Sequence, residues 1–353
     1  MEHTQTCSDY GKVKLMDIPY GELKTTVVGS FPLQHSIENM RRALSDQIEA
    51  GVNFPCYGQL LDMNLMFLEP LAKEKCGIDM IAGEAWITGL LEVPKRPITL
   101  EFLEFAQDYL KKNPSKEVDG IKVPITGPIT LSSVTKVSEK HHAIEYPDFI
   151  LDFSNIVVEL AKWYDKAGAG LIMIDEPSLG YAAWLGIGPD VLIEAVNKPI
   201  KAIKSALPSF HVCGDISAVT NILIQSEAPI LDHSFKDFPA NLEFYSKGIL
   251  EKADKMIGFG CVSSTPDPQL LLDIGAGKSQ WAEAVESVNE IEKLILEGGR
   301  RFGLERLIID PDCGFRGMEE YFKDDTGQRI ATEKLKNMVE AARRARKNLE
   351  ISQ

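Results

Sequence analysis

Eight short apolar segments alternate with helical patterns along this chain of 353 residues, and this alternation constrains the fold more than any other feature. The predicted strands occupy residues 25–32, 51–59, 122–128, 171–175, 208–215, 229–235, 256–262 and 306–314. Strands that are apolar on both faces are typical of a parallel sheet covered by helices. Eight such units predict an α/β fold of the (β/α)8 TIM barrel type, with a doubly wound sheet as the alternative.

End signals support several of the predicted helices. In the stretch 36–51, Ser36 can cap the start and Gly51 can close the end. Its apolar residues share one helical face: Ile37, Met40, Leu44 and Ile48. Further helices are expected over 149–167, 216–226, 240–254 and 329–349.

Two other helices carry more specific signals. Ser287 and Glu290 form a capping box that opens a helix running to about Arg301. Another helix begins near Asp190, and Pro199 is expected to interrupt it because proline lacks the N–H that a helix needs.

Two regions fall outside the alternation. Residues 1–24 are polar and aperiodic, so we expect an N-terminal tail or arm ahead of a single barrel domain over 25–353. Residues 80–97, MIAGEAWITGLLEVPKRP, are expected to form an excursion between the second and third strands, either a hairpin or a lid.

Composition excludes several classes of partner. A net charge of −14 argues against nucleic acid and against an anionic membrane surface as binding partners. The chain has no apolar run of membrane-spanning length, and its first residues lack the apolar core of a signal peptide. We therefore expect a cytoplasmic protein.

The six cysteines are widely and unevenly spaced, which does not fit a disulfide framework. Cys56, Cys76 and Cys261 are expected to be core residues, and Cys7 to be exposed. Cys213 and Cys313 differ because each stands at the end of a predicted strand.

Active sites of (β/α)8 barrels lie at the carboxyl ends of the strands. In HVCGD (211–215), His211 and Cys213 are two positions apart, so they point to the same side of a strand. The closing strand, ending in PDCG, brings Cys313 near them. Two cysteines and a histidine at this edge predict a zinc site, while His233 is more consistent with a supporting role.

Other polar residues share this edge: Ser30, Gln59, Thr126 and Ser234. Asp175 and Glu176 end another strand, and successive strand residues face opposite ways. Only one of the two is therefore expected to enter the site, and we favour Asp175.

Taken together, the motifs resemble those of the cobalamin-independent methionine synthases, in particular the short "core" forms. They are TVVGSFP, GQ at 58–59, TGPIT at 126–130, IDEPSLG at 174–180, HVCGD, LDHSF, GFGCV and IDPDCG. The resemblance runs from about Thr25 to the end of the chain. It implies a (β/α)8 barrel with a catalytic zinc ion that methylates the thiol of homocysteine.

Position by position, the resemblance assigns roles to seven residues. Zinc is expected on His211, Cys213 and Cys313. Asp175, the one catalytic residue expected, holds the substrate amino group, and Gln59 lies near it. The backbone turn that binds the substrate carboxylate corresponds to Val28 and Ser30.

Two positions depart from the family pattern. Ser234 stands where the family has a glutamate ligand, so water, Ser234, Asp237 or substrate is left to complete the zinc shell. Tyr57 stands where the core forms have an aspartate, a change that bears on substrate or donor recognition.

The resemblance to the core forms also implies a methylated corrinoid protein as methyl donor, docking over the barrel mouth. Two alternatives stay open. One is a related zinc thiol methyltransferase of the coenzyme M type, for which an amino-binding Asp175 would be idle. The other is a non-catalytic zinc-binding barrel, although three distant ligands with an open position fit catalysis better.

Overall fold

A six-stranded parallel sheet forms the centre of the molecule in the computed structural model, which describes residues 19–351. Its strands follow the order β10-β9-β8-β7-β6-β3. They are β3 (Lys122–Thr126), β6 (Leu171–Asp175), β7 (Leu207–His211), β8 (Ile230–Ser234), β9 (Met256–Gly260) and β10 (Leu307–Asp310). All neighbouring pairs are parallel, which confirms the predicted α/β class. Cys7 and most of the predicted tail lie outside the described residues.

The first two predicted strands join the two edges of this sheet through single bridges instead of continuous ladders. Residue pairs in parallel bridges are Thr25 with Ile309, Thr26 with Phe54, Ser30 with Gln59, and Cys56 with Lys122. The chain segments 25–30 and 54–59 therefore lie between β10 and β3. Pro55, which has no N–H to donate, helps to explain why the second segment forms no regular strand.

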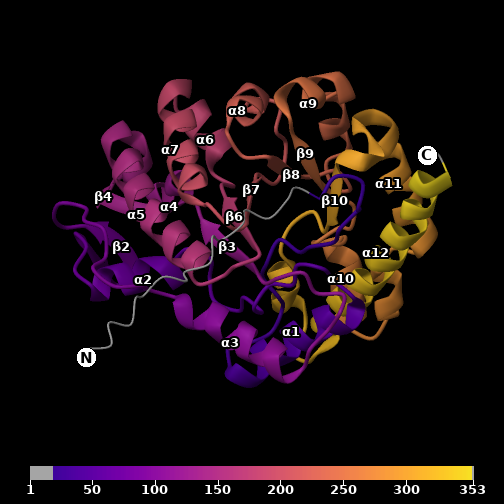
Figure 1. The fold of residues 1–353 in the computed structure, drawn as a ribbon. Helices are drawn as coiled ribbons and strands as arrows, with labels where there is room; N and C mark the ends of the chain where they lie inside the picture. Colours follow the sequence, from indigo (N-terminus) through magenta and orange to yellow (C-terminus); the bar gives the residue numbers. More distant parts are fainter. Residues whose placement is uncertain (1–18, 352–353) are drawn as a thin grey trace, which may run out of the picture.

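Helices surround the sheet (Figure 1). They are α1 (Ile37–Ala50), α2 (Leu65–Lys73), α3 (Leu100–Lys112), α4 (Pro128–Val134), α5 (Pro147–Lys166), α6 (Leu179–Trp184), α7 (Pro189–Ala202), α8 (Thr220–Gln225), α9 (Lys247–Ala253), α10 (Pro268–Gly275), α11 (Val288–Phe302) and α12 (Thr326–Ile351). Within residues 19–351, none of them is long and apolar enough to cross a membrane.

Alternate strand residues divide the apolar interior into two clusters. The larger lies between the sheet and the helices. The smaller lines the inner face of the sheet and consists of Val28, Phe54, Leu171, Met173, Leu207, Ile230, Met256 and Ile308. Since Leu171, Met173 and Asp175 alternate along β6, the inner face continues upward from apolar residues to a polar group at the carboxyl end.

The helix-end signals operate as expected. Ser36 Oγ accepts a hydrogen bond from the Asn39 N–H at the start of α1, and Gly51 closes that helix with a φ of 87°. The Ser287–Glu290 capping box is present at the start of α11. The predicted helix over 240–254 divides into a 3₁₀ turn, Pro239–Glu243, and α9.

The prediction that Pro199 interrupts its helix was wrong, because α7 continues to Ala202. Proline cannot donate to the carbonyl four residues earlier, which belongs to Ala195. Ser154 Oγ on the neighbouring α5 donates to that carbonyl at 2.6 Å. A side chain from the adjacent helix thus satisfies the acceptor that proline leaves free.

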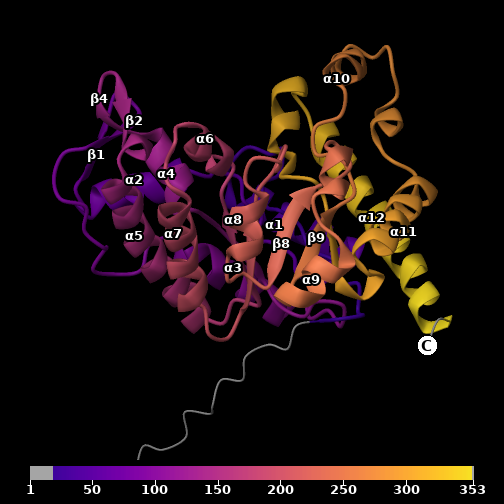
Figure 2. The same ribbon diagram turned by 90° about the horizontal axis from the view of Figure 1, so that it is seen from above.

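The predicted excursion contains a hairpin of β1 (Ile78–Ile81) and β2 (Glu84–Ile87). Its two-residue turn has positive φ angles at Ala82 and Gly83, which matches the twist of antiparallel strands. Strands β4 (Thr135–Ser138) and β5 (His141–His142) extend the hairpin to a second sheet. Figure 2 shows this sheet at one end of the molecule, far from α10.

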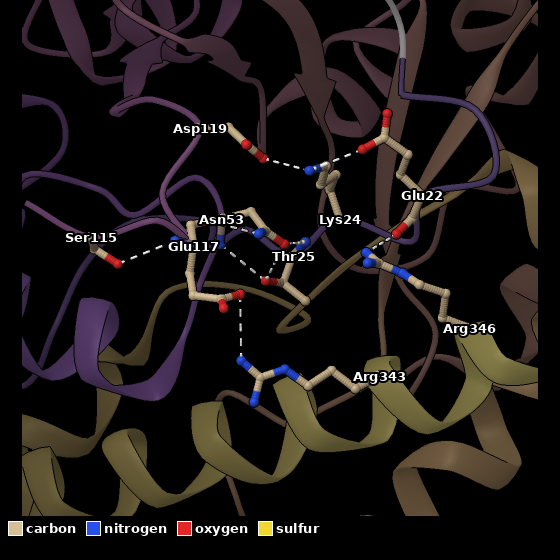
Figure 3. Close-up of polar contacts among 9 residues, drawn as sticks. All are labelled: Glu22, Lys24, Thr25, Asn53, Ser115, Glu117, Asp119, Arg343 and Arg346. Atoms are coloured by element: carbon tan, nitrogen blue, oxygen red, sulfur yellow. Dashed lines mark hydrogen bonds and ion pairs between the residues drawn. The ribbon is translucent and has the colours of Figure 1, made fainter.

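A polar network fixes the start of the described chain at the amino ends of the strands (Figure 3). Asn53 Oδ1 accepts from both the N–H and the hydroxyl of Thr25, at 2.9 and 3.1 Å. Asn53 Nδ2 donates to the Glu117 carbonyl at 2.8 Å, and Lys24 pairs with Asp119 at 2.9 Å. These contacts hold the segment that leads into residues 25–30.

Candidate metal centre

Three predicted ligands come together at the carboxyl ends of two strands. His211 is the last residue of β7, Cys213 follows two residues later, and Cys313 follows β10. One ligand atom from each lies within 4.8 Å of the others. His211 is buried, and the two cysteines are partly buried. A nitrogen and two sulfur atoms at this spacing are a donor set suited to zinc.

The two nitrogens of the His211 ring have different surroundings. Nδ1 donates to Oδ1 of Asp232 at 2.5 Å, whereas Nε2 is buried and has no hydrogen-bond partner among the described residues. A histidine that ligates a metal through one nitrogen usually donates its other N–H to a carboxylate. The unpartnered Nε2 therefore fits a metal ligand.

The electrostatic field at this ring also favours a cation. Burial lowers the pKa of His211, but the Asp232 carboxylate outweighs burial and raises it to about 10. Burial acts against ionisation of Asp232, yet a hydrogen bond from Asp310 and the nearby His211 bring its pKa down to about 2. The field that favours a proton on this ring would also favour a metal ion beside it.

Asp310 is the weaker acid in the pair that it forms with Asp232. Burial and the Asp232 charge raise the pKa of Asp310 well above its usual range. With both groups ionised, three buried carboxylate oxygens would have no hydrogen-bond donor among the described residues, which favours a proton shared between the two groups. Gly258 leaves room for this pair, since a Cβ there would lie 2.4 Å from Oδ2 of Asp232.

The two thiols differ in acidity. A hydrogen bond from Cys313 outweighs burial and lowers the pKa of Cys213. The same interaction, together with burial, raises the pKa of Cys313 well above its usual range. Cys213 is therefore the more acidic thiol of the pair, and metal binding would displace the proton from Cys313.

A cavity of about 120 Å³ adjoins the three ligands. Its walls are Val28, Gly29, Ser30, Gln59, Met63, Asp175, Pro177, His211, Cys213, Cys313 and Gly314. Every residue that the sequence assigned to substrate or metal thus lines one cavity. A cavity of this volume suits a small metabolite.

Asp175 and Glu176 face opposite ways, as predicted. Oδ1 of Asp175 is buried in the cavity wall with no hydrogen-bond partner among the described residues. Burial raises the pKa of Asp175 to about 6, while Lys122 and His211 act in the opposite direction. Glu176 points away and accepts from the backbone of Ile129 and Thr130. Asp175 therefore offers a free acceptor to a ligand.

The two departures from the family pattern lie outside the cavity wall. Ser234 Oγ donates to the Asp312 carbonyl at 2.8 Å, and Asp237 N–H donates to the carboxylate of Asp312 at 2.5 Å. The Tyr57 ring stacks on Phe102 with their centroids 5.4 Å apart. Asp237 is not part of the cluster of His, Cys, Asp and Glu ligand atoms formed by the described residues.

Other residues that the sequence singled out also have defined places in the structure. His233 is buried, its Nδ1 pairs with the Val212 carbonyl at 3.0 Å and its ring stacks on Tyr245, which confirms a supporting residue. Thr126 Oγ1 donates to the carbonyl of Met63 and so holds the cavity wall. The three cysteines expected in the core are all buried: Cys56, Cys76 and Cys261.

Sequence reasoning missed two inner-face residues next to the site, Asp232 and Lys122. Asp232 lies two positions before Ser234, and Lys122 lies four positions before Thr126. The alternation of strand residues places each on the same face as the residue that was singled out. The alternation pattern thus indicates both residues, although neither stands at the carboxyl end of its strand, where active-site residues are expected.

Comparison with known proteins identifies the family. The family described as "Cobalamin-independent synthase, Catalytic domain" matches residues 84–344. The methionine synthase of Methanothermobacter marburgensis is 31% identical over 341 residues, covering 90% of this chain and 98% of that protein. The methionine synthase of Methanocaldococcus jannaschii is 30% identical, with 90% and 98% covered.

Solved structures agree on the fold. The B12-independent methionine synthase from Shewanella sp. W3-18-1 superposes with a TM-score of 0.66 at 16% identity, covering 93% of this chain and 99% of that one. A methyltransferase from Methanosarcina mazei gives 0.56 at 18% identity, covering 92% and 94%. With sequence similarity along nearly the whole chain, this protein belongs to the cobalamin-independent methionine synthase family, a family of methyltransferase enzymes.

Proposed function

We propose that this enzyme transfers a methyl group to the thiol of homocysteine and that it does so with a zinc ion held by His211, Cys213 and Cys313. One observation carries the proposal: the unpartnered Nε2 of His211, the two sulfur atoms and the unpartnered Oδ1 of Asp175 all face one small cavity. A soft metal donor set and an amino-binding carboxylate thus lie within the reach of one amino acid thiol.

The cavity walls bind the two ends of the substrate separately. Oδ1 of Asp175 accepts a hydrogen bond from the substrate ammonium group, with Gln59 beside it. The backbone of residues 28–30 receives the carboxylate. This leaves the thiol directed at the two cysteines, so that binding holds the reacting sulfur in one position.

Zinc, when bound, supplies Lewis acidity that ionises a coordinated thiol at neutral pH. The proton of the substrate thiol is released to solvent. A new carbon–sulfur bond forms as the bond between the methyl group and the donor breaks, and the donor keeps that electron pair. Ser234 is held by Asp312, so water or the substrate thiol is the proposed fourth ligand.

The donor has to approach from outside, because the cavity has no room for a second large molecule. We propose a methylated corrinoid protein in this role, as the resemblance to the core forms implies. The same resemblance, with the bridges that join segments 25–30 and 54–59 to both sheet edges, supports a closed (β/α)8 barrel. The cytoplasmic location expected from the sequence stays a prediction.

The test is methionine formation from L-homocysteine by purified, zinc-loaded protein, with methylcobalamin as a surrogate donor and mass spectrometry as the readout. Parallel reactions contain coenzyme M as acceptor, and Cys313→Ser serves as the inactive control with Cys261→Ser as its match. The proposal is supported if wild type and Cys261→Ser form methionine and Cys313→Ser does not. Equal or faster methylation of coenzyme M would favour the alternative acceptor.

Measuring homocysteine binding by calorimetry tests the proposed acceptor independently of the proposed methyl donor. If homocysteine binds and its thiol is not methylated by methylcobalamin, the acceptor assignment stands and the corrinoid donor is wrong. A protein that holds zinc and binds neither thiol would instead be the non-catalytic zinc-binding form.

A further inference from the structure

Lys122 is a fully buried lysine on the inner face of the sheet, and it contacts the cavity wall at Val28. It begins β3, and its bridge to Cys56 joins that strand to the segment 54–59. Burying an ammonium group is costly unless hydrogen bonds and opposite charges compensate for lost water. Lys122 therefore has to be matched by its surroundings, and those surroundings are parts of the substrate site.

Its ammonium group donates to the main-chain carbonyl of Val28. Val28, Gly29 and Ser30 form the cavity wall that, under the proposed function, receives the substrate carboxylate. Among the described residues, the N–H groups of Gly29 and Ser30 have no hydrogen-bond acceptor. The turn thus has two N–H donors that are free to bind a ligand in the cavity. Its Val28 carbonyl is held by the Lys122 ammonium group.

The geometry of the peptide links these two facts. In a trans peptide the C=O of Val28 and the N–H of Gly29 point in opposite directions. A carbonyl held toward Lys122 therefore directs the Gly29 N–H away from Lys122. A charged hydrogen bond to the carbonyl also polarises the peptide group and makes that N–H a stronger donor.

The positive charge has a second effect on the same site. Lys122 acts on the carboxyl groups of Asp175 and Asp310, and it favours the ionised form of both. In the β3–β6 register, Lys122 pairs with Leu171, and Thr126 at the other end pairs with Asp175. The lysine thus contacts the carboxylate-binding turn through Val28, and its charge also acts on the amino-binding group.

We propose that Lys122 is a positioning residue for substrate recognition: its buried ammonium group anchors the Val28 carbonyl and so orients the turn that binds the substrate carboxylate. This inference rests on the proposed function. It predicts that loss of Lys122 weakens binding of thiols that carry a carboxylate far more than binding of thiols that do not.

The experiment compares the KM of L-homocysteine with that of 3-aminopropanethiol, which lacks only the carboxylate. Lys122→Met is expected to raise the KM of homocysteine about 10-fold or more, and that of 3-aminopropanethiol much less. Lys122→Gln keeps a neutral donor and is expected to lie between Lys122→Met and wild type. KM values do not depend on the fraction of folded enzyme, so partial unfolding does not imitate the result.

Lys255 provides the matched control. It is also a buried lysine that donates to two main-chain carbonyls, those of Ser226 and Ala228, at 2.6 and 2.7 Å. It lies at the amino end of β9, outside the cavity wall. Lys255→Met is expected to lower thermal stability while leaving the ratio of the two KM values unchanged.

Equal KM changes for both thiols in Lys122→Met, or no change for either, would overturn the inference while leaving homocysteine methylation intact. If Lys122→Met does not fold, Lys122→Gln carries the same comparison. Wild-type enzyme that neither binds nor methylates homocysteine would instead overturn the proposed function, and the role of Lys122 with it.

Discussion

Nδ1 of His211 lies 2.5 Å from Oδ1 of Asp232, and neither side chain is more than 2% exposed. This contact fixes the tautomer of the ring, so that Nε2 is the nitrogen left to meet a ligand. It also places a negative charge behind the proposed metal. The strength of metal binding should therefore depend on a residue that does not touch the metal.

Replacing Asp232 tests this dependence. Asp232→Asn removes the charge, and we expect zinc affinity to fall about 10–100-fold. Competition with a chromophoric chelator measures the change. Asp165→Asn is the matched control, because Asp165 is a buried aspartate that accepts only backbone N–H groups. Equal zinc affinities in wild type and Asp232→Asn would show that zinc binding by His211 does not depend on the Asp232 carboxylate.

The two cysteines should be required for metal. Purified protein is expected to hold about one zinc ion per chain, and Cys213→Ser and Cys313→Ser are each expected to lose most of it. Metal analysis gives the content, and circular dichroism checks the fold. Cys261→Ser, a buried cysteine outside the cluster, should keep its zinc. If both site variants hold as much zinc as wild type, Cys213 and Cys313 are not zinc ligands.

The acidity of Asp175 predicts a pH dependence for substrate recognition. Its pKa is raised to about 6, so the carboxylate is ionised above that pH and neutral below it. We expect kcat/KM for homocysteine to fall as the pH drops through 6, because the neutral acid no longer attracts the substrate ammonium group. Asp175→Asn should lower kcat/KM about 10-fold or more and remove this step.

4-Mercaptobutanoate is the control for this pH effect, because it is homocysteine without the amino group. Its kcat/KM relative to that of homocysteine should change with pH in wild type and stay constant in Asp175→Asn. A parallel loss for both thiols would place the titrating group elsewhere.

Ser234 should contribute to the stability of the fold and not to zinc binding. Its hydroxyl donates to the Asp312 carbonyl, so Ser234→Ala is expected to lower the free energy of unfolding by about 1 kcal/mol. Zinc content should stay unchanged. A clear loss of zinc in Ser234→Ala would make Ser234 the fourth ligand after all. Urea denaturation and metal analysis of the same samples decide between these outcomes.

Asn53 should contribute to stability from the opposite end of the strands. Asn53→Ala removes its bonds to Thr25 and Glu117, and we expect the free energy of unfolding to fall by about 1–3 kcal/mol. Asn113→Ala, whose amide contacts only its own helix, should have a much smaller effect. Unchanged stability in Asn53→Ala would show that the network in Figure 3 is not needed to hold the chain.

Many residues of the candidate site could be predicted from the sequence because they stand at the ends of predicted strands. His211, Cys213, Asp175 and Cys313 each stand where an apolar run stops, and parallel strands bring such positions to one edge. The alternation of strand side chains indicated that only one of Asp175 and Glu176 would enter the site, and the resemblance to the family matched Asp175 to the amino-binding carboxylate. No knowledge of side-chain packing was necessary for these positions.

Structural features that depend on contacts between residues distant in sequence could not be predicted from the sequence. Whether Pro199 breaks its helix depends on Ser154, which lies 45 positions earlier and supplies a donor to the free carbonyl. The strand β4 exists because Ala85 and Trp86 of the hairpin pair with it, and nothing within its own four residues indicates this partner. The interaction between Asp232 and Asp310 likewise requires β8 and β10 to be placed on either side of β9.

The absent side chain at Gly258 has a consequence for engineering this enzyme. Exchanging a glycine in a strand for alanine usually strengthens the strand. Here the added methyl group would collide with the Asp232 carboxylate, which orients His211. A routine stabilising substitution on β9 would therefore damage the activity two strands away, and libraries for thermostability should leave position 258 unchanged.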